Sequence, residues 1–377
     1  MHNSHNNHFI FNLFLTPYMK SASIIKPKSS LEIVTKETPK PIGAQVLVRV
    51  EACGVCHSDI HLWEGGYEGP DGEFLKATDR GVRYPLTPGH EIAGVVEEVG
   101  EEVSSLNLFN KNSKVLVYPW LGEGMCPACR EGNENLCDKP RSLGVYRDGG
   151  YSEYVLVPSY RYLLDITNEI QTGSFDVNTA ATLSCSSLTA YGAINNASLR
   201  PNDTVVIIGA GGLGLMAIQI AKAISGSTVI ALDLDDNKLR AAKENGADYV
   251  VNAMKDNRVE TVMELTQKLG ADAVIDFANS TKSIELGMQL LRKRARLVHV
   301  GLYGGALKLN LLSMPTRAYK LIGSYTGNIA QLAELVSLAR RGVIKPLVSD
   351  KFNLEQATEA LSKLKEGKVL GRGVINP

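Results

Sequence analysis

Cysteine is scarce in this 377-residue chain, which contains only six: Cys53, Cys56, Cys126, Cys129, Cys137 and Cys185. So few cysteines in so long a chain exclude the disulfide framework that is typical of small secreted domains. Four of the six form two Cys-x-x-Cys pairs. This usage favours metal binding in a reducing compartment, and we expect a cytoplasmic protein.

Net charge is absent as well, because 40 basic residues balance 40 acidic ones. Without a long basic run, the chain has no feature that predicts nucleic acid or a membrane surface as a partner. No segment offers the ~20 unbroken apolar residues that a membrane span requires. With 44% hydrophobic residues, the chain can instead bury the cores of about two or three domains.

Residues 1–18 lack the features of a targeting segment. Their short apolar stretch, 9–15, cannot cross a bilayer, and a Lys/Arg start and a small-residue cleavage site are both missing. Histidines in this segment can in principle catch a metal, although we interpret it as a disordered extension. These histidines are His2, His5 and His8. We expect the folded protein to begin at Met19.

Two patterns divide the remaining chain. From Gln45 to about Val157, short apolar runs are separated by Gly, Pro and Asp clusters, which is typical of a β-rich domain. The runs are Val46–Val50, Ile92–Val96 and Lys114–Val117, with a loop expected over Trp63–Tyr84.

From about residue 200 onward, apolar runs alternate with helical segments. Such alternation predicts an α/β fold with a doubly wound parallel sheet. The expected strands are Thr204–Ile208, Thr228–Leu232, Tyr249–Val251, Ala273–Phe277 and Arg296–Val300, and the expected helices include Leu213–Ile224 and Asp236–Asn245.

A glycine-rich turn opens the first of these helices. The run Gly209-Ala210-Gly211-Gly212-Leu213-Gly214 matches the pattern G-x-G-x-x-G in the strand–turn–helix context of a dinucleotide site. Gly209 permits the tight turn, Gly211 lets the backbone approach a pyrophosphate, and Gly214 allows close helix–strand packing. Free N–H groups at the helix start then face the phosphates.

Asp233 lies 24 residues after Gly209, near the distance expected for an acid that binds the adenosine ribose. Its carboxylate would repel the extra phosphate of NADP, so we expect NAD as the cofactor. The alternative is a structural β-turn-α unit in which Asp233 only caps the helix that follows.

A compact group of potential metal ligands spans 15 residues: Glu123, Cys126, Cys129 and Cys137. Four such ligands close a tetrahedral zinc shell and leave no position for a substrate, so this site is predicted to be structural. The alternatives are free or buried cysteines around a turn, and a plain surface role for Glu123.

Cys56, His90 and Cys185 are scattered, so their spacing does not show whether they converge. Taken separately, Cys56 can form a redox pair with Cys53, His90 can be a hydrogen-bonded core histidine, and Cys185 can be a small buried apolar residue.

Three motifs in order resemble the zinc-containing alcohol dehydrogenases of the medium-chain dehydrogenase/reductase family. They are Gly54-Val55-Cys56-His57-Ser58-Asp59, Gly89-His90-Glu91-x2-Gly94-x5-Gly100-x2-Val103 and the glycine-rich turn. The resemblance covers roughly residues 20–377 and ends at Gly371-Arg372. It is greatest to archaeal NAD-linked members, which also carry Glu in place of the first structural-zinc cysteine.

The resemblance implies a GroES-like catalytic domain and a Rossmann-type domain that binds NAD. The catalytic domain would span 19–185 and be completed by 322–377, and the Rossmann domain would span 186–321. The implied activity is oxidation of primary or secondary alcohols to aldehydes or ketones, with hydride transfer from a zinc-bound alkoxide to NAD.

The same resemblance assigns the site residues. Cys56, His90 and Cys185 would bind the catalytic zinc, one of two zinc ions per subunit, and Ser58 and His61 would relay the alcohol proton to solvent. Asp59 would orient His90, Glu91 would stand behind the metal, and Thr189 would abut the nicotinamide while Cys185 holds the metal. Further cofactor contacts would come from His57, as a titratable phosphate partner, and from Gly212, Leu213, Lys238, Gly301, Leu302 and Arg372.

Trp120 and Trp63 suggest an apolar, aromatic substrate channel, although either can equally be core. A polyol or threonine dehydrogenase on the same scaffold is the main alternative, and a zinc-free quinone reductase is disfavoured by the three zinc ligands. The family also implies a homo-oligomer, with a tetramer favoured over a dimer.

Overall fold

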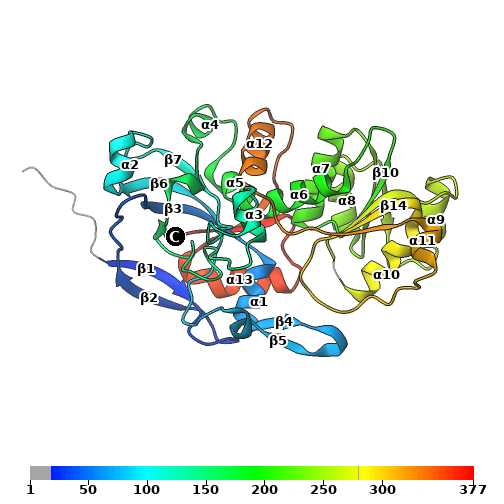
Figure 1. The fold of residues 1–377 in the computed structure, drawn as a ribbon, viewed down its shortest axis with the longest axis horizontal. Helices are drawn as coiled ribbons and strands as arrows, with labels where there is room; N and C mark the ends of the chain where they lie inside the picture. Colours follow the sequence, from blue (N-terminus) through cyan, green and yellow to red (C-terminus); the bar gives the residue numbers. More distant parts are fainter. Residues whose placement is uncertain (1–17, 279) are drawn as a thin grey trace, which may run out of the picture.

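The computed structural model describes residues 18–278 and 280–377 as two lobes side by side (Figure 1). The predicted extension therefore lies outside the described residues, apart from Tyr18, which opens strand β1 (Tyr18–Ser23). Strand β1 pairs antiparallel with β2 (Glu32–Glu37). The chain thus enters the fold one residue before the predicted start at Met19.

The first lobe, called the β lobe below, contains a seven-stranded sheet that combines strands from the first half of the chain with its last two strands. Its order is β16 (Val348–Asn353), β17 (Arg372–Asn376), β3 (Val46–Val55), β6 (Glu91–Val99), β7 (Lys114–Val117) and β9 (Leu163–Asp165), with β8 (Tyr154–Val157) also paired to β3. The three predicted apolar runs all lie in this sheet. Because β17 pairs with β3, the C-terminal segment completes the lobe that the N-terminal half begins.

The second lobe, called the α/β lobe, contains a six-stranded sheet in which every neighbouring pair is parallel. Its order is β12 (Tyr249–Asn252), β11 (Thr228–Asp233), β10 (Thr204–Ile208), β13 (Ala271–Asp276), β14 (Leu291–His299) and β15 (Lys320–Gly323). The helices that wrap it include α7 (Gly212–Ile224), α8 (Asp236–Glu244), α9 (Arg258–Leu265) and α10 (Thr281–Leu290). The predicted doubly wound parallel sheet is confirmed, and β15 runs past the expected boundary at residue 321.

Strand order reverses beside β10, and this reversal places a crevice at the carboxyl ends of β10 and β13. The glycine-rich turn leaves β10 at this point and leads into α7. The position where a parallel sheet binds ligands is therefore the position where the sequence predicts a dinucleotide.

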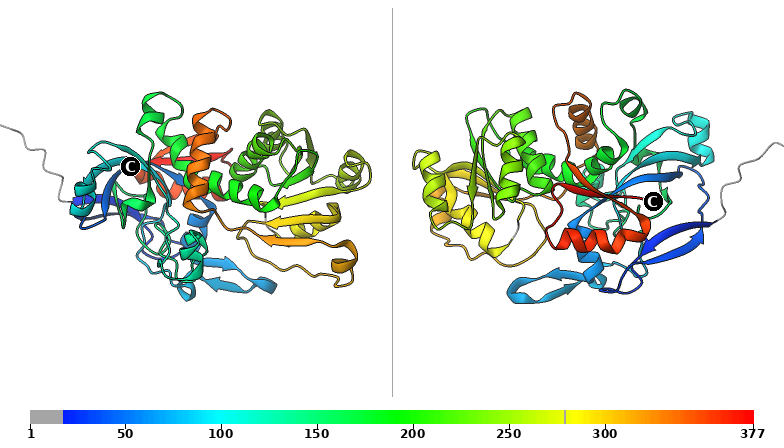
Figure 2. Two further views of the ribbon diagram at one scale, coloured as in Figure 1. Left: turned by 45° about the horizontal axis from the view of Figure 1, so that its top comes forward. Right: turned by 180° about the vertical axis from the view of Figure 1, so that it is seen from behind.

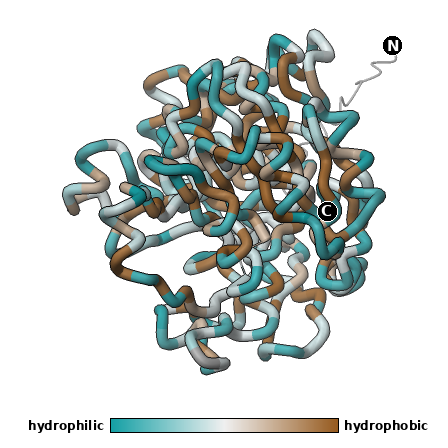
Figure 3. Tube along the Cα trace, turned by 90° about the vertical axis from the view of Figure 1, so that its right-hand side faces the viewer, coloured by the Kyte–Doolittle hydropathy of each residue, from teal (hydrophilic) through white to brown (hydrophobic). Residues whose placement is uncertain are grey.

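Helices and one hydrophobic core connect the two lobes (Figure 2). The connecting helices are α5 (Val177–Thr182), a π-helical turn η5 (Leu183–Ser187), α6 (Leu188–Ala197) and α12 (Ile329–Arg340). The core contains Leu116 of the β lobe together with Val205 and Ile275 of the α/β lobe. Hydrophobic segments run through the interior, and hydrophilic ones cover much of the outside (Figure 3).

The remaining elements are short: α1 (His57–Glu64), β4 (Gly66–Glu68), η1 (Pro70–Gly72), β5 (Phe74–Lys76), η2 (Ala77–Arg80), α2 (Glu101–Leu106), α3 (Pro127–Arg130), η3 (Glu134–Leu136), η4 (Tyr160–Tyr162), α4 (Thr167–Gln171), α11 (Ser313–Arg317), η6 (Leu354–Gln356) and α13 (Ala357–Lys365). Five of these elements lie wholly or partly in the segment 63–84, which the sequence predicts to be a loop. Three-residue strands are too short to show an alternating apolar pattern. Within the described residues, no helix is both long enough and apolar enough to span a bilayer.

The glycine-rich turn gives a test of the fold. A Cβ on Gly214 would lie 1.8 Å from the carbonyl oxygen of Gly209, whereas a Cβ on Gly211 would meet nothing within 4 Å. Gly214→Ala is therefore expected to destabilise the protein by about 1–3 kcal/mol. Gly211→Ala should change the free energy of unfolding by less than about 0.5 kcal/mol. Urea unfolding of both variants measures this difference, and equal stabilities would contradict the packing.

Candidate active site and metal centres

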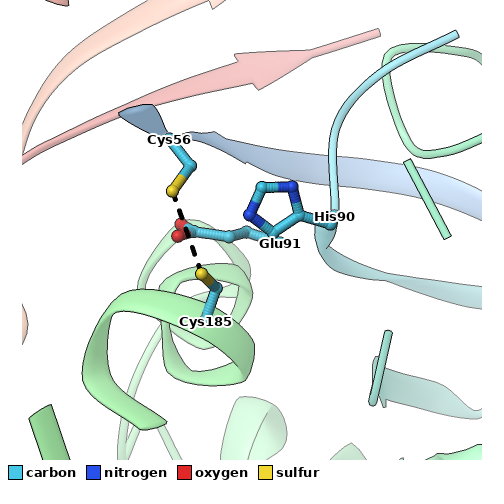
Figure 4. A group of neighbouring side chains, drawn as sticks. All are labelled: Cys56, His90, Glu91 and Cys185. Atoms are coloured by element: carbon cyan, nitrogen blue, oxygen red, sulfur yellow. Dashed lines mark hydrogen bonds between the residues drawn. The ribbon is translucent and has the colours of Figure 1, made fainter. Parts of the chain in front are cut away.

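Four buried side chains from three separate segments converge between the lobes. Cys56 precedes helix α1, His90 directly precedes β6, Glu91 is the first residue of β6, and Cys185 lies in the π-helical turn η5. Their ligand atoms all lie within 4.8 Å of one another (Figure 4). The tertiary structure therefore resolves the ambiguity in the sequence, since Cys56, His90 and Cys185 share one site.

This cluster fits a tetrahedral metal ion. The sulfurs of Cys56 and Cys185 are 3.9 Å apart, close to the about 3.8 Å that two 2.3 Å zinc–sulfur bonds at a tetrahedral angle require. The Nε2 atom of His90 is buried and has no hydrogen-bond partner among the described residues. A buried imidazole nitrogen without a partner next to two thiols is what a zinc ligand set looks like without its ion.

The charges in the cluster favour a thiolate. The pKa of Cys56 is well below its usual value, because the Cys185 thiol hydrogen-bonds to its sulfur and because Arg372 and His90 supply positive charge. The pKa of Cys185 is raised by the same hydrogen bond and by burial. Two neighbouring buried sulfurs whose surroundings favour a thiolate suit a bound cation, which is the chemistry of a metal centre.

Asp59 fixes the imidazole from behind. This fully buried carboxylate accepts hydrogen bonds from the N–H of Cys56 (2.9 Å), the N–H of Gly89 (3.2 Å) and the hydroxyl of Tyr151 (3.1 Å). Its Oδ1 lies 3.2 Å from Nδ1 of His90, the ring nitrogen away from the thiols. Although burial opposes protonation of His90, Asp59 and Cys56 raise its pKa well above the usual value. Asp59 thus faces His90, the residue that the sequence analysis expects it to orient.

Glu91 has a partner that the sequence analysis does not predict. The Nε atom of Arg372 donates to both carboxylate oxygens of Glu91 at 3.2 and 3.1 Å, and Nη2 donates to Oε1. Both side chains are buried, and Arg372 also lines the large cavity described below. Two of the donors of Arg372 are therefore engaged with Glu91, which lies beside the metal ligands. The role of Arg372 as a phosphate contact remains a prediction.

A cavity of about 680 Å³ connects the cluster with the glycine-rich turn. It is lined by all the residues predicted to contact the cofactor, and by Cys56, Ser58, His61 and Cys185. The cofactor residues are His57, Thr189, Gly209, Gly211, Gly212, Leu213, Gly214, Asp233, Lys238, Gly301, Leu302 and Arg372. Open space at Gly211 leaves room for a phosphate against the backbone. The residues fit an extended dinucleotide whose one end reaches the metal cluster.

Asp233 has a structural role in addition to its place in this cavity. Its Oδ2 accepts a hydrogen bond from the N–H of Ala210 at 2.7 Å, and its Oδ1 accepts one from the N–H of Asp235 at 3.0 Å. Helix α8 is capped by Asp235 instead. Asp233 thus braces the glycine-rich turn and lines the cavity, and the alternative that it only caps the following helix is wrong.

Two histidines of helix α1 pack against tyrosines. The ring of His61 lies 4.7 Å from that of Tyr67 and 5.6 Å from that of Tyr303, and Tyr303 is also 5.6 Å from His57. Burial lowers the pKa of His57 to about 4, so this ring is neutral at neutral pH, unlike the titratable phosphate partner that the sequence suggests. Burial also lowers the pKa of His61.

The two tryptophans differ in position. Trp120 is buried, its ring lies 5.2 Å from that of His90, and its indole N–H donates to the carbonyl of Ser184. Trp120 therefore packs against the thiol–imidazole cluster, but it lines neither of the two described cavities, so its place in a substrate channel remains a prediction. Trp63 donates to the carbonyl of Ser29 and packs beside Lys365, and it lines neither of the two described cavities. Trp63 belongs to the packing of the β lobe. This is the alternative of a core tryptophan that the sequence analysis left open.

The second predicted cluster also assembles. The ligand atoms of Glu123, Cys126, Cys129 and Cys137 lie within 4.8 Å of one another. Cys126 Sγ is 3.4 Å from Cys129 Sγ and 3.7 Å from Cys137 Sγ. Four ligands around one point fit a closed tetrahedral shell. The Glu123 carboxylate also accepts hydrogen bonds from the N–H groups of Met125 and Cys126, which hold it in the loop.

Sequence reasoning missed the tyrosines of the site. Tyr151, Tyr303 and Tyr325 stand respectively behind Asp59, between two histidines, and beside Trp120. None lies in a motif, and a tyrosine on an apolar background gives no signal of its own. Only Tyr303 could have been predicted from the sequence, because it directly follows the predicted cofactor contacts Gly301 and Leu302.

Comparisons with known proteins agree with this geometry. The family model described as "Alcohol dehydrogenase GroES-like domain" matches residues 43–168, and that described as "Zinc-binding dehydrogenase" matches residues 212–341. An "NAD-dependent alcohol dehydrogenase" of Sulfurisphaera tokodaii is 44% identical over 95% of this chain and 100% of its own. The crystal structure of the alcohol dehydrogenase from Aeropyrum pernix superposes with a TM-score of 0.85 at 34% identity, over 95% of this chain and 100% of that chain.

A "D-arabinose 1-dehydrogenase (NADP(+))" of Saccharolobus solfataricus is 33% identical over 95% of this chain and 97% of its own.

The two lobes, the cavity with its glycine-rich turn and the buried thiol–imidazole cluster define a zinc-binding, dinucleotide-dependent dehydrogenase. The chain belongs to the zinc-containing alcohol dehydrogenases of the medium-chain dehydrogenase/reductase family.

The position of Asp59 predicts an effect on metal binding. Asp59→Asn removes the negative charge behind His90 and is expected to weaken zinc binding by about 10- to 100-fold, as is typical when a partner of a ligand is lost. Competition with a chromogenic chelator measures the affinity. Asp148→Asn, at an exposed carboxylate paired with Lys36, is the control and should bind zinc like the unmodified protein. Equal affinities for all three proteins would rule out this role of Asp59.

Proposed function

We propose that this chain is a zinc-dependent alcohol dehydrogenase that oxidises primary or secondary alcohols with NAD. The observation that carries the proposal is one cavity with the thiol–imidazole cluster at one end and the glycine-rich turn with Asp233 at the other. A hydride can pass only between two groups that are in contact. This single cavity has room for the alcohol at the cluster and for the nicotinamide of NAD beside it. The similarity to alcohol dehydrogenases over the whole chain supports the same activity.

Cys56, His90 and Cys185 would hold the catalytic zinc. When bound, zinc supplies a Lewis acid that makes an alcohol hydroxyl acidic near neutral pH, and NAD supplies the hydride acceptor. Three protein ligands leave a fourth position free, as a catalytic site requires. Glu123, Cys126, Cys129 and Cys137 would hold a second, structural zinc, which gives two ions per subunit.

The protein's own groups then position the reactants. Asp59 holds the ring of His90, and Trp120 covers the cluster and keeps water away from it. Ser58 and His61 both line the cavity, and we assign to them the passage of the alcohol proton toward solvent. Thr189 lies four residues after Cys185 and faces the same cavity, where it would support the nicotinamide.

We further propose the domain division of the sequence analysis, with the catalytic domain formed by 19–185 and 322–377, except that residues 322 and 323 belong with β15 to the sheet of the α/β lobe. The support is the pairing of β17 with β3, which ties the last strand to the first half of the chain. A cytoplasmic homo-oligomer, tetramer over dimer, remains our expectation. The exposed side chains of Leu311 and Leu312, near the edge strand β15, are compatible with such an assembly.

Polyol oxidation is the second candidate, because the chain also resembles a D-arabinose 1-dehydrogenase. That relative is named for NADP, however, whereas the carboxylate of Asp233 lines this cavity, where we expect it to face the adenosine ribose of NAD. A panel of simple, aromatic and polyhydroxy alcohols with NAD separates the two candidates. The thiol ligands are consistent with oxidation of simple alcohols and of polyols, but they disfavour a zinc-free quinone reductase.

Zinc content and activity together test the proposal. Cys56→Ala is expected to lose about half of the bound zinc and all measurable alcohol oxidation, because an open zinc site needs its three ligands. Cys137→Ala should instead lose the other half and lower the melting temperature. Metal analysis, NADH formation and thermal unfolding give the three readouts. Retained turnover in Cys56→Ala would discard the proposed function.

Cofactor choice gives an independent prediction. Asp233→Gly removes the carboxylate that would repel the 2′-phosphate, so the ratio of kcat/KM with NADP to that with NAD should rise by about tenfold or more. Asp235→Ala is the matched control, since Asp235 caps α8 and does not line the cavity. A ratio unchanged in Asp233→Gly, or raised equally in both variants, would refute the role of Asp233.

A further inference from the structure

A second cavity, of about 560 Å³, adjoins the first. The two cavities share Ser58, Gly301, Leu302 and Tyr325 in their walls. Because Ser58 lies two residues after Cys56, the second cavity opens beside the proposed reaction centre. It is the space available to the part of the substrate that does not react.

The outer wall of this cavity is the β4–β5 hairpin with the turn η2, the segment that the sequence predicts to be a loop. The hairpin meets the α/β lobe closely, since a Cβ on Gly304 would lie only 1.7 Å from the carbonyl oxygen of Glu68. Glycine at 304, with φ +101°, is thus required for this contact. The hairpin reaches across from the β lobe and closes the cavity from the side.

Aromatic side chains line much of this space, among them Tyr67, Tyr146 and Tyr325. Burial raises the pKa of Tyr67 and of Tyr325, so both are neutral near pH 7, and burial lowers the pKa of His299, which is neutral as well. The tyrosine rings suit a flat, apolar substrate body.

Arg80 adds a positive charge to this wall. Its guanidinium carbon lies 5.2 Å from the centre of the Tyr67 ring, which holds the planar group over the aromatic face. Among the described residues, no carboxylate forms an ion pair with Arg80. Glu68 is the acidic side chain of the same wall, and no ion pair joins it to Arg80. The charge of Arg80 therefore remains available to a ligand.

We propose that the preferred substrate carries a carboxylate, which Arg80 binds at the outer wall while the alcohol group reaches the Cys56–His90–Cys185 cluster past Ser58. The proposal rests on the alcohol dehydrogenase function proposed above. A guanidinium binds a carboxylate through two parallel hydrogen bonds, which a neutral alcohol cannot replace. The aromatic walls favour an aromatic body between the two ends.

The test compares 4-(hydroxymethyl)benzoate with its methyl ester, using the NAD-supplemented zinc enzyme. The free acid is expected to have a kcat/KM about tenfold or more above that of the ester, as one charge-assisted contact supplies. Arg80→Gln should lower kcat/KM for the acid by about 10- to 100-fold and that for the ester by less than about twofold. Arg83→Gln, at an exposed arginine that lines neither cavity, should leave both values unchanged.

Two further arms make the outcome decisive. Glu68→Gln removes the opposing carboxylate and should raise the acid-to-ester ratio, and Arg80→Lys should restore part of the preference lost in Arg80→Gln. An equal loss for acid and ester in Arg80→Gln would show that Arg80 only supports Tyr67, and the proposal would be wrong. A preference of the unmodified enzyme for the ester would overturn it too. Failure of the underlying function would look different, because benzyl alcohol would then give no NADH.

Discussion

The structure is arranged around two sulfur atoms that share one hydrogen bond and one buried imidazole nitrogen that has no hydrogen-bond partner among the described residues. Burying a thiolate or an unpaired imidazole nitrogen is costly unless a cation or a hydrogen bond compensates. The carboxylate of Asp59 lies 3.2 Å from Nδ1 on the far side of His90, and Cys56 and Cys185 share one hydrogen bond. The side of the cluster that faces the cavity can take a metal ion. Such an ion would offset the cost of burying these ligand atoms, and it would lie where the alcohol is expected to react.

The rest of the structure brings the two lobes to this cluster. Cys56 comes from the β lobe and Cys185 from the helices that join the lobes, and one continuous core holds these elements in place. The ion pair of Glu91 with Arg372 ties the last strand to the segment that carries His90. Packed side chains and this ion pair therefore hold the cluster residues in place between the two lobes.

Chemistry and selectivity occupy different parts of the same space. The cluster and the glycine-rich turn lie in one cavity, and both carry motifs by which the sequence resembles the family. The wall formed by the β4–β5 hairpin lies in the adjoining cavity, and it carries the charged side chains Arg80 and Glu68. Short surface elements can vary without disturbing a core, which is why a hairpin of this kind can set the substrate while the reaction stays the same.

Local features were determined by the sequence itself. The strand–turn–helix around Gly209–Gly214 and the cluster from Glu123 to Cys137 each fit within a few turns of chain, so spacing alone predicts their geometry. The strands β10 and β7 begin and end where their apolar runs do. Only the tertiary structure decided that Cys56 meets Cys185, 129 residues away, and that Arg372 meets Glu91, 281 residues away. Such pairs depend on how whole sheets and helices pack, and no local pattern of residues encodes that arrangement.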